Sequence, residues 1–287
     1  MQQELISYEA AVHWMREQPH YAEMIEHCYL DRDNLASAER FAASEEFGEA
    51  CRLLGLRPGQ PKRVLDLGCG NGIASYAFAN RGCAVMAVDP DMSDDVGLMA
   101  AERLREKISR GSITIAQATA ESLPFADDTF DVIYERQALH HFSDLPKGLT
   151  ECARVLKPGG RFLAAREHVV TDGQQLAVFL QEHILHQLHG GENAYTVAHY
   201  QESLRNAGLT VVKTMAPMDN VINHFPVSNA EVRQAMTDWL TARVGRRLGS
   251  AIARLPFIET AYRHRQSRRN QSPGRVYSFL CSKGDRL

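Results

Sequence analysis

Several signals that would place a protein in a specialised class are missing from these 287 residues. No apolar run reaches the roughly 18 residues that a membrane-spanning helix requires. The N-terminal residues are acidic rather than basic and apolar, unlike those of a secretory signal peptide. The six cysteines are scattered without a C-x-x-C pair, which argues against a disulfide framework and against a zinc site. These absences lead us to expect a cytoplasmic protein.

Charge and composition also lack an extreme. The formal net charge of −3 argues against a general nucleic-acid binder, so we expect a small-molecule substrate, no nucleic acid and no membrane span. With 44% hydrophobic and 23% charged residues, the composition is that of an ordinary globular protein. The length exceeds one typical domain, but a single α/β sheet with its helices often extends this far.

The stretch from residue 64 to 79 carries the clearest local signal. Residues 64–67 predict a short buried strand, three glycines at every second position from Gly68 to Gly72 predict a tight turn, and residues 73–79 begin a helix. The dinucleotide fingerprint G-x-G-x-x-G has a different glycine spacing. A carboxylate, Asp66, precedes the turn, and it would favour a cationic sulfonium or ammonium over an anionic pyrophosphate. The pattern therefore favours S-adenosylmethionine over NAD.

Further motifs follow in a recognisable order. Residues 84–89 predict a second strand ending in Asp89, which follows Gly70 at the interval that ribose hydroxyls require of an acid. Residues 118–134, the A-L-H-H-F ending at 142 and the L-K-P-G-G-x-F segment at 156–162 complete the series. Over residues 63–168 the chain resembles the class I S-adenosylmethionine-dependent methyltransferases, of the small-molecule type found in quinone biosynthesis. The sequence departs from the family where Ala118 and Thr119 replace a glycine and an aspartate, the latter a usual adenine contact.

The resemblance implies an α/β fold with a Rossmann-like, seven-stranded, mostly parallel sheet whose last strand is antiparallel. We expect an N-terminal helical cap over residues 1–58 and a cofactor-binding core over 59–218, with substrate-side helices at 172–207. A helical basic insertion at 219–274 would precede the last strand of the core at 275–287. The residues assigned to S-adenosylmethionine are Asp66, Gly68, Cys69, Gly70, Gly72, Asp89, Pro90, Thr119, Ala120, Glu121 and Arg136.

The reaction is constrained by another absence. No [D/N]-P-P-[Y/F] tetrad follows the fourth strand, which reduces the weight of nucleobase and amide nitrogen methylation. We expect O-methylation of a small hydroxylated metabolite or sugar. C-methylation of an activated ring stays open, and so does a non-catalytic module that only binds the cofactor, because Thr119 weakens the adenine contact.

Candidate catalytic side chains follow the fourth and fifth strands, since ligands of open α/β sheets bind beyond the carboxyl ends of the strands. His141, Glu167 and His168 are the catalytic candidates, with His168 favoured as general base and Glu167 as the group that orients it. His140, His183 and Tyr195 are the substrate-binding candidates. His183 and His186, one turn apart on a helix predicted over 174–188, offer two metal ligands but no evident third, so we expect no metal.

The insertion is unusually basic. Nine arginines between Arg243 and Arg275 face a single acid, Glu259. Such a run is either a solvated helical face or a contact for an anionic substrate, carrier or partner protein. We favour the solvated face, because few aromatics are interleaved with the arginines.

Overall fold

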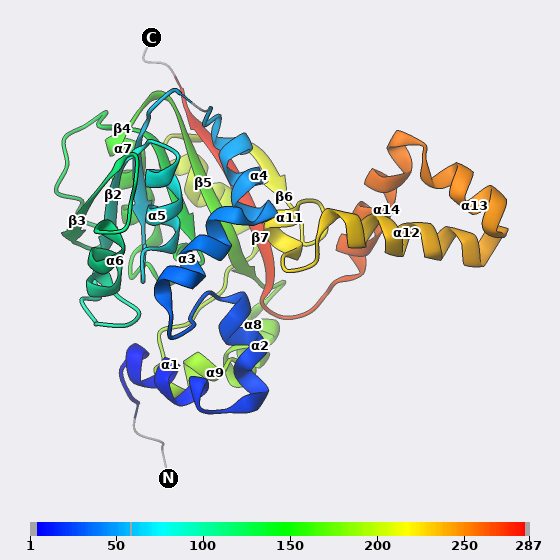
Figure 1. Cartoon of the computed structure of the whole chain (residues 1–287), viewed down its shortest axis with the longest axis horizontal. Coiled ribbons are helices and arrows are strands. Elements are labelled where there is room, and N and C mark those ends of the chain that lie inside the picture. Colours follow the sequence, from blue (N-terminus) through cyan, green and yellow to red (C-terminus); the bar gives the residue numbers. More distant parts are fainter. Residues whose placement is uncertain (1–4, 58, 285–287) are drawn as a thin grey trace.

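Seven strands form one sheet in the order β3-β2-β1-β4-β5-β7-β6 in the computed structural model, which describes residues 5–57 and 59–284 (Figure 1). Strands β1 to β5 are parallel, whereas β7 lies between β5 and β6 and is antiparallel to both. The predicted fold class is confirmed. The strands are β1 (Arg63–Leu67), β2 (Ala84–Asp89), β3 (Ser112–Gln117), β4 (Phe130–Arg136), β5 (Leu156–Val169), β6 (Leu209–Met215) and β7 (Arg275–Lys283).

Helices cover both faces of this sheet, as parallel strands with apolar side chains on both sides require. None of the helices in the described part of the chain is long and apolar enough to cross a membrane. They are α1 (Tyr8–Arg16), η1 (Pro19–Tyr21), α2 (Ala22–His27), α3 (Asn34–Ala43), α4 (Glu45–Leu54), α5 (Ile73–Asn80), α6 (Leu98–Arg105), η2 (Leu139–His141), α7 (Leu145–Val155), α8 (Gly173–Glu182), α9 (Ile184–Leu188), α10 (Val197–Asn206), α11 (Val221–His224), α12 (Asn229–Val244), α13 (Arg246–Ala253) and α14 (Pro256–Arg269).

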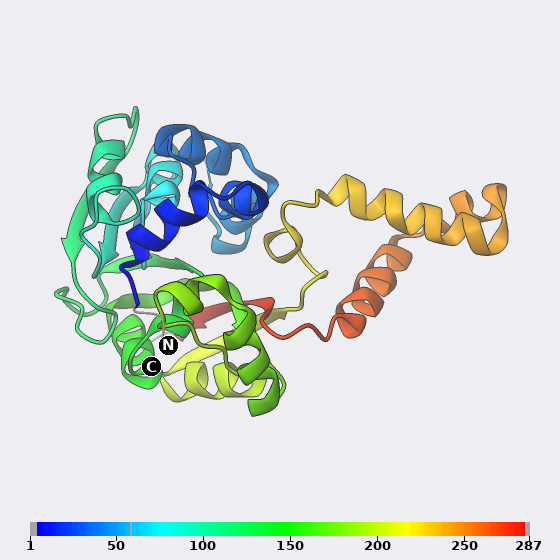
Figure 2. The same ribbon diagram turned by 90° about the horizontal axis from the view of Figure 1, so that it is seen from below.

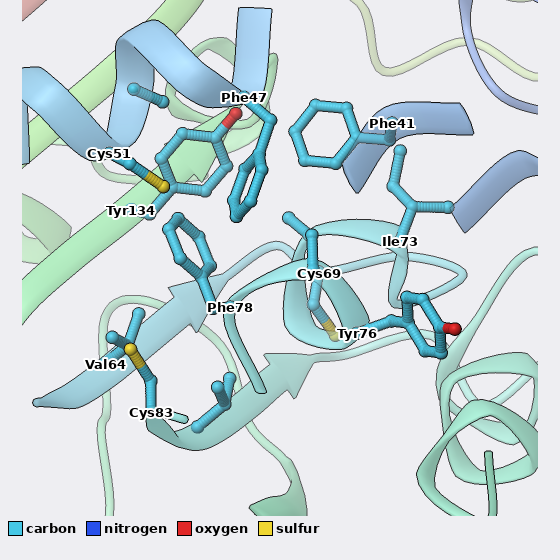
Figure 3. Packing of buried hydrophobic residues seen from close by; sticks show 14 of the residues in the cluster. Phe41, Phe47, Cys51, Val64, Cys69, Ile73, Tyr76, Phe78, Cys83 and Tyr134 are labelled. Carbon is cyan, nitrogen blue, oxygen red and sulfur yellow. The ribbon is translucent and has the colours of Figure 1, made fainter. Parts of the chain in front are cut away.

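The N-terminal helices divide between two apolar clusters. Phe41 of α3 and Phe47 of α4 pack with Phe78 of α5 and Tyr134 of β4, so these two helices share the main core of the sheet (Figure 3). Helices α1 and α2 form a smaller cluster with Val96 and with α9, in which α1 contributes Ala11, Val12 and Met15. In α2, Ile25 is buried, whereas Met24 is 42% exposed.

Some predicted element boundaries are wrong. The helix expected over 174–188 breaks at His183, whose ψ of 111° ends α8 and begins α9. The lysine, proline and glycines after α7 belong to the 14-residue strand β5, which begins at Leu156. Residue 58, where the N-terminal helical cap is expected to end, lies outside the described residues.

Helices α12 to α14 form an arm that extends well away from the sheet (Figures 1 and 2). The interpretation of its arginines as a solvated face needs correction at Arg263, which is buried and donates to Glu259 and to the carbonyl of Met218. Arg243 and Arg265 are exposed and lie over the ring of Trp239. Arg263 therefore connects α14 to the segment before the arm, and Arg265 connects α14 to α12.

Candidate active site

The glycine turn after β1 has the backbone that its sequence predicts. Gly68, Gly70 and Gly72 have φ values of 68°, 48° and 81°, in the left-handed region that side chains disfavour. A Cβ on Gly68 would lie 2.5 Å from the Cβ of Ala138, directly after β4. The turn therefore touches the segment that leaves β4.

Two aspartates organise this turn. Asp66 is 2% exposed and accepts a hydrogen bond from Ser75 Oγ at 2.6 Å, beneath the turn. Burial raises the pKa of Asp66 to about 7. Asp89 is half-buried and accepts from the amides of Gly70 and Asp91, both at 2.9 Å, and burial raises its pKa as well. Each Asp89 oxygen keeps a lone pair for a ligand hydroxyl.

The other residues assigned to the cofactor differ in their surroundings. Pro90 and Thr119 are exposed at the edge of the sheet, whereas Cys69 and Ala120 are buried. Glu121 accepts from the amide of Asp144 at 3.1 Å. These positions line the carboxyl ends of β1, β2 and β3, where a nucleoside would lie.

Arg136 has a buried partner that no local sequence pattern indicates. Its Nε and Nη2 donate to both carboxylate oxygens of Glu46 on α4, at 2.8 and 3.2 Å, and its Nη1 donates to Gln137 at 3.0 Å. Glu46 is fully buried, and the Arg136 side chain is 11% exposed. This buried ion pair connects β4 to the N-terminal helices, and the assignment of Arg136 to the cofactor stays a prediction.

A second polar group lies at the carboxyl ends of β4 and β5. Glu167 is completely buried and accepts from His140 Nδ1 at 2.8 Å and from the amides of Ala138 and His140 at 3.1 Å. On the other side of His140, its Nε2 lies 3.5 Å from Glu192 Oε2. The ring of His168 packs edge-on against His140 with centroids 4.8 Å apart. The residues predicted at these two strand ends are therefore brought together.

The electrostatics of this group change the roles predicted for its members. Burial alone would lower the pKa of His140, but the Glu167 and Glu192 carboxylates outweigh it and raise that pKa to about 9. Burial and the adjacent His140 lower the pKa of His168 to about 3, and its Nδ1 donates to the carbonyl of Gly274 at 2.8 Å. A histidine with so low a pKa is a weak proton acceptor. The prediction of His168 as general base is therefore not supported, and Glu167 orients His140 rather than His168.

Two residues with a left-handed backbone conformation orient these side chains. Gln137 follows β4 with φ 56°, and Arg166 has φ 63° at the irregularity where the pairing of β5 with β7 shifts register. Bulges of this kind redirect the side chains that follow them. Glu167 and His168 come directly after Arg166, and Glu167 thereby faces the backbone amides that follow Gln137. Non-glycine residues in this conformation often cluster at functional sites.

The remaining candidates lie around this group. His141 is half-exposed, with Nδ1 3.3 Å from the carbonyl of Gly191. His183 Nδ1 lies 3.8 Å from Oε1 of Glu192, which is on the loop between α9 and α10. The break between α8 and α9 therefore lies next to this loop. Tyr195 pairs with Val169 in an isolated bridge and packs its ring on Tyr200, which indicates a structural contact.

Three buried acids were missed by sequence reasoning: Glu46, Glu135 and Glu192. Glu135 accepts from the amides of Ala138 and Leu139, and burial together with Glu167 raises its pKa well above the usual range. Glu192 follows two glycines in a loop, and an acid in such a loop was the only signal for it in the sequence.

Helix α1 covers this region from the cofactor side to the substrate side. Its Glu9 accepts from the amide of Asp95, and His13 and Arg16 contact the Asp95 carboxylate at 2.8 and 3.2 Å. Just before α1, the amide of Ile6 donates to the carbonyl of Leu188 at the end of α9. The N-terminal segment thus bridges the loop after β2 and the end of α9.

Comparison with known proteins agrees with this geometry. Residues 65–164 match the family described as "Methyltransferase domain". A "Ubiquinone biosynthesis O-methyltransferase" of Rhizobium etli is 33% identical over 156 residues, which make up 54% of this chain and 60% of that protein. The chain therefore spans less than two thirds of this relative's length.

Solved structures share the fold at low sequence identity. A geranyl diphosphate methyltransferase in complex with S-adenosylmethionine aligns with a TM-score of 0.55 at 14% identity, covering 90% of this chain and 95% of that one. The [4+2]-cyclase SpnF also aligns with a TM-score of 0.55, at 20% identity over 89% and 85% of the two chains. Because that neighbour is named for another reaction, the fold alone does not define the chemistry.

The residues present fit S-adenosylmethionine: a turn with three glycines, a buried carboxylate beneath it, and a half-buried Asp89 with free acceptor capacity. Together with the match over residues 65–164, they establish that the chain carries a methyltransferase domain of the class I type, whose members use S-adenosylmethionine.

Proposed function

We propose that this protein transfers a methyl group from S-adenosylmethionine to an oxygen of a small hydroxylated metabolite or sugar. The observation that carries the proposal is the contact between Gly68 and Ala138, two residues before His140. It sets the cofactor turn beside a buried polar group at the ends of β4 and β5. The name of the Rhizobium relative, an O-methyltransferase, supports oxygen as the acceptor.

The bound cofactor would supply an electrophilic methyl group on a sulfonium, and the chain's residues then have to align it with an acceptor. Asp89 would accept from the ribose hydroxyls, and Asp66 would place negative charge beneath the turn. Glu192 and His140 offer hydrogen-bonding groups that can orient an acceptor hydroxyl. Helix α1, held at Asp95, would keep water away from the reacting atoms.

The first test is calorimetric titration of the purified chain with S-adenosylmethionine and S-adenosylhomocysteine. Asp89→Ala is expected to abolish binding, because it removes the acceptor for the ribose. The matched control is Asp238→Ala, which changes an aspartate on α12 whose side chain accepts a hydrogen bond from its helix neighbour Gln234. Loss of binding in both variants, or in neither, would contradict the assigned site.

The second test concerns the acceptor. The chain is incubated with isotopically labelled methyl donor and hydroxylated compounds, each paired with its O-methylated analogue, in which the acceptor oxygen is blocked. Labelled products are expected only from the free hydroxyls, with the methyl on oxygen by NMR. A methyl on carbon would replace the proposal with C-methylation. Cofactor binding without product from any compound would favour a non-catalytic module.

A further inference from the structure

We propose that His140, His168 and Glu192 bind a divalent transition-metal ion, zinc by preference, beside the proposed methyl-acceptor position. One ligand atom from each of the three residues lies within 4.8 Å of the other two. Two histidines and one carboxylate form a ligand set that zinc uses in catalytic sites, where the fourth position stays open to water or substrate. His168 and Glu192 lie outside residues 65–164, so the domain match does not account for this arrangement.

In both His140 and His168, the hydrogen bond is made by Nδ1, which leaves Nε2 as the nitrogen that can bind an ion. His168 Nδ1 lies 2.8 Å from the Gly274 carbonyl, and His140 Nδ1 lies 2.8 Å from the Glu167 carboxylate. A carbonyl and an ionised carboxylate only accept, so each Nδ1 must carry the proton. Nε2 of His168 is then available for coordination, and Nε2 of His140 becomes available when the ion displaces its proton. Partners of this kind on the outer nitrogen accompany almost every metal-binding histidine.

Glu192 supplies an independent observation. Its side chain is only 5% exposed, and its Oε2 forms no hydrogen bond with the described residues, although His140 Nε2 at 3.5 Å and His141 Nε2 at 3.9 Å lie within ion-pair distance. A buried carboxylate oxygen without a donor is costly, and an ion is one of the partners that account for it. The 3.5 Å between Glu192 Oε2 and His140 Nε2 is close to the edge of a zinc tetrahedron, about 3.4 Å for bonds of about 2.05 Å.

A fourth side chain lies within reach. His183 Nδ1 is buried without a hydrogen-bond partner among the described residues, 3.8 Å from Glu192 Oε1. It stands at the break between α8 and α9, where a small change in backbone angle would move its ring. The site can therefore hold an ion with three protein ligands and an open position, or with four.

The ion would add to the proposed function without depending on it. A hydroxyl that binds a divalent cation loses its proton more readily, so the ion would activate the acceptor oxygen. The competing arrangement is a proton on His140 Nε2, shared with Glu192 and with no metal. The two arrangements differ in whether the protein retains an ion, and this is measurable without methyl transfer.

The experiment uses the full, untagged chain, stripped with a chelator, loaded with zinc and desalted. Elemental analysis is expected to give one zinc per chain, and cobalt in place of zinc is expected to give the visible absorption bands of a tetrahedral site. Glu192→Gln and His168→Ala should each weaken zinc binding by more than about tenfold. The matched control His264→Ala, an exposed histidine on the arm, should leave binding unchanged.

Circular dichroism and S-adenosylmethionine titration on the same samples show whether each variant is folded. A folded wild type that retains no zinc, or folded Glu192→Gln and His168→Ala variants that bind zinc as the wild type does, would overturn the metal site. The proposed function fails separately. A chain that binds zinc but no S-adenosylmethionine refutes that function while leaving the metal site in place.

Discussion

Replacing Gly72 by alanine tests the link between the cofactor turn and the packing of helices. The added Cβ would lie 2.5 Å from the Cβ and 2.7 Å from the Cα of Ala101 on α6, and backbone cannot move as a flexible side chain can. We expect a cost of about 1–2 kcal/mol for a side chain at φ 81° and about 1–3 kcal/mol for the overlap. The sum, about 2–5 kcal/mol, is a large part of the 5–15 kcal/mol that typically stabilises a protein.

Urea unfolding followed by circular dichroism measures this loss, and Gly82→Ala is the matched control. Gly82 has φ 92°, but a Cβ there would meet nothing within 4 Å, so only the cost of about 1–2 kcal/mol for the left-handed backbone applies. The difference between the two variants isolates the contact with Ala101. We also expect Gly72→Ala to weaken S-adenosylmethionine binding, since the turn has to move. Equal stability of both variants, with full cofactor affinity, would refute the reasoning.

Two further predictions concern buried charges. Because burial raises the pKa of Asp66 to about 7, its carboxyl is mostly protonated near pH 6 and mostly ionised near pH 8. S-adenosylmethionine carries a sulfonium, whereas the sulfur of S-adenosylhomocysteine is neutral. Calorimetry should therefore show the affinity for S-adenosylmethionine rising relative to that for S-adenosylhomocysteine as pH rises through about 7. Asp66→Asn should remove this trend, and a ratio of the two affinities that does not change with pH in the wild type would contradict it. Glu46→Ala leaves the Arg136 guanidinium buried and unpaired, and should cost about 3–5 kcal/mol in urea unfolding. The double variant Glu46→Leu/Arg136→Met should recover most of that stability and bind S-adenosylmethionine as the wild type does. A stable double variant that binds no cofactor would instead show that Arg136 contributes to the cofactor site.

The sequence allowed the cofactor half of the site to be predicted because its signals are local. A glycine turn between a strand and a helix is characteristic of nucleotide-binding βαβ units, and Asp89 follows it at a fixed interval along one such unit. The mostly parallel sheet and its antiparallel last strand were implied by the resemblance over residues 63–168, and they are confirmed. Arg136 shows the limit of this reasoning, because its partner Glu46 lies 90 residues earlier and no local pattern connects them.

The polar group at the ends of β4 and β5 could be located but not understood from the sequence. Parallel strands bring His140 and His168 to the same edge, and that much was predictable. Their chemistry depends on Glu167 turning toward the backbone after β4, which requires the left-handed Arg166, and on Glu192 arriving from a loop more than 20 residues away. The ordinary pKa of histidine predicts a base at the end of a strand. Burial lowers the pKa of His168, and the hydrogen bond from its Nδ1 to the Gly274 carbonyl fixes the orientation of its ring, so His168 is a weak base despite its place at the end of a strand.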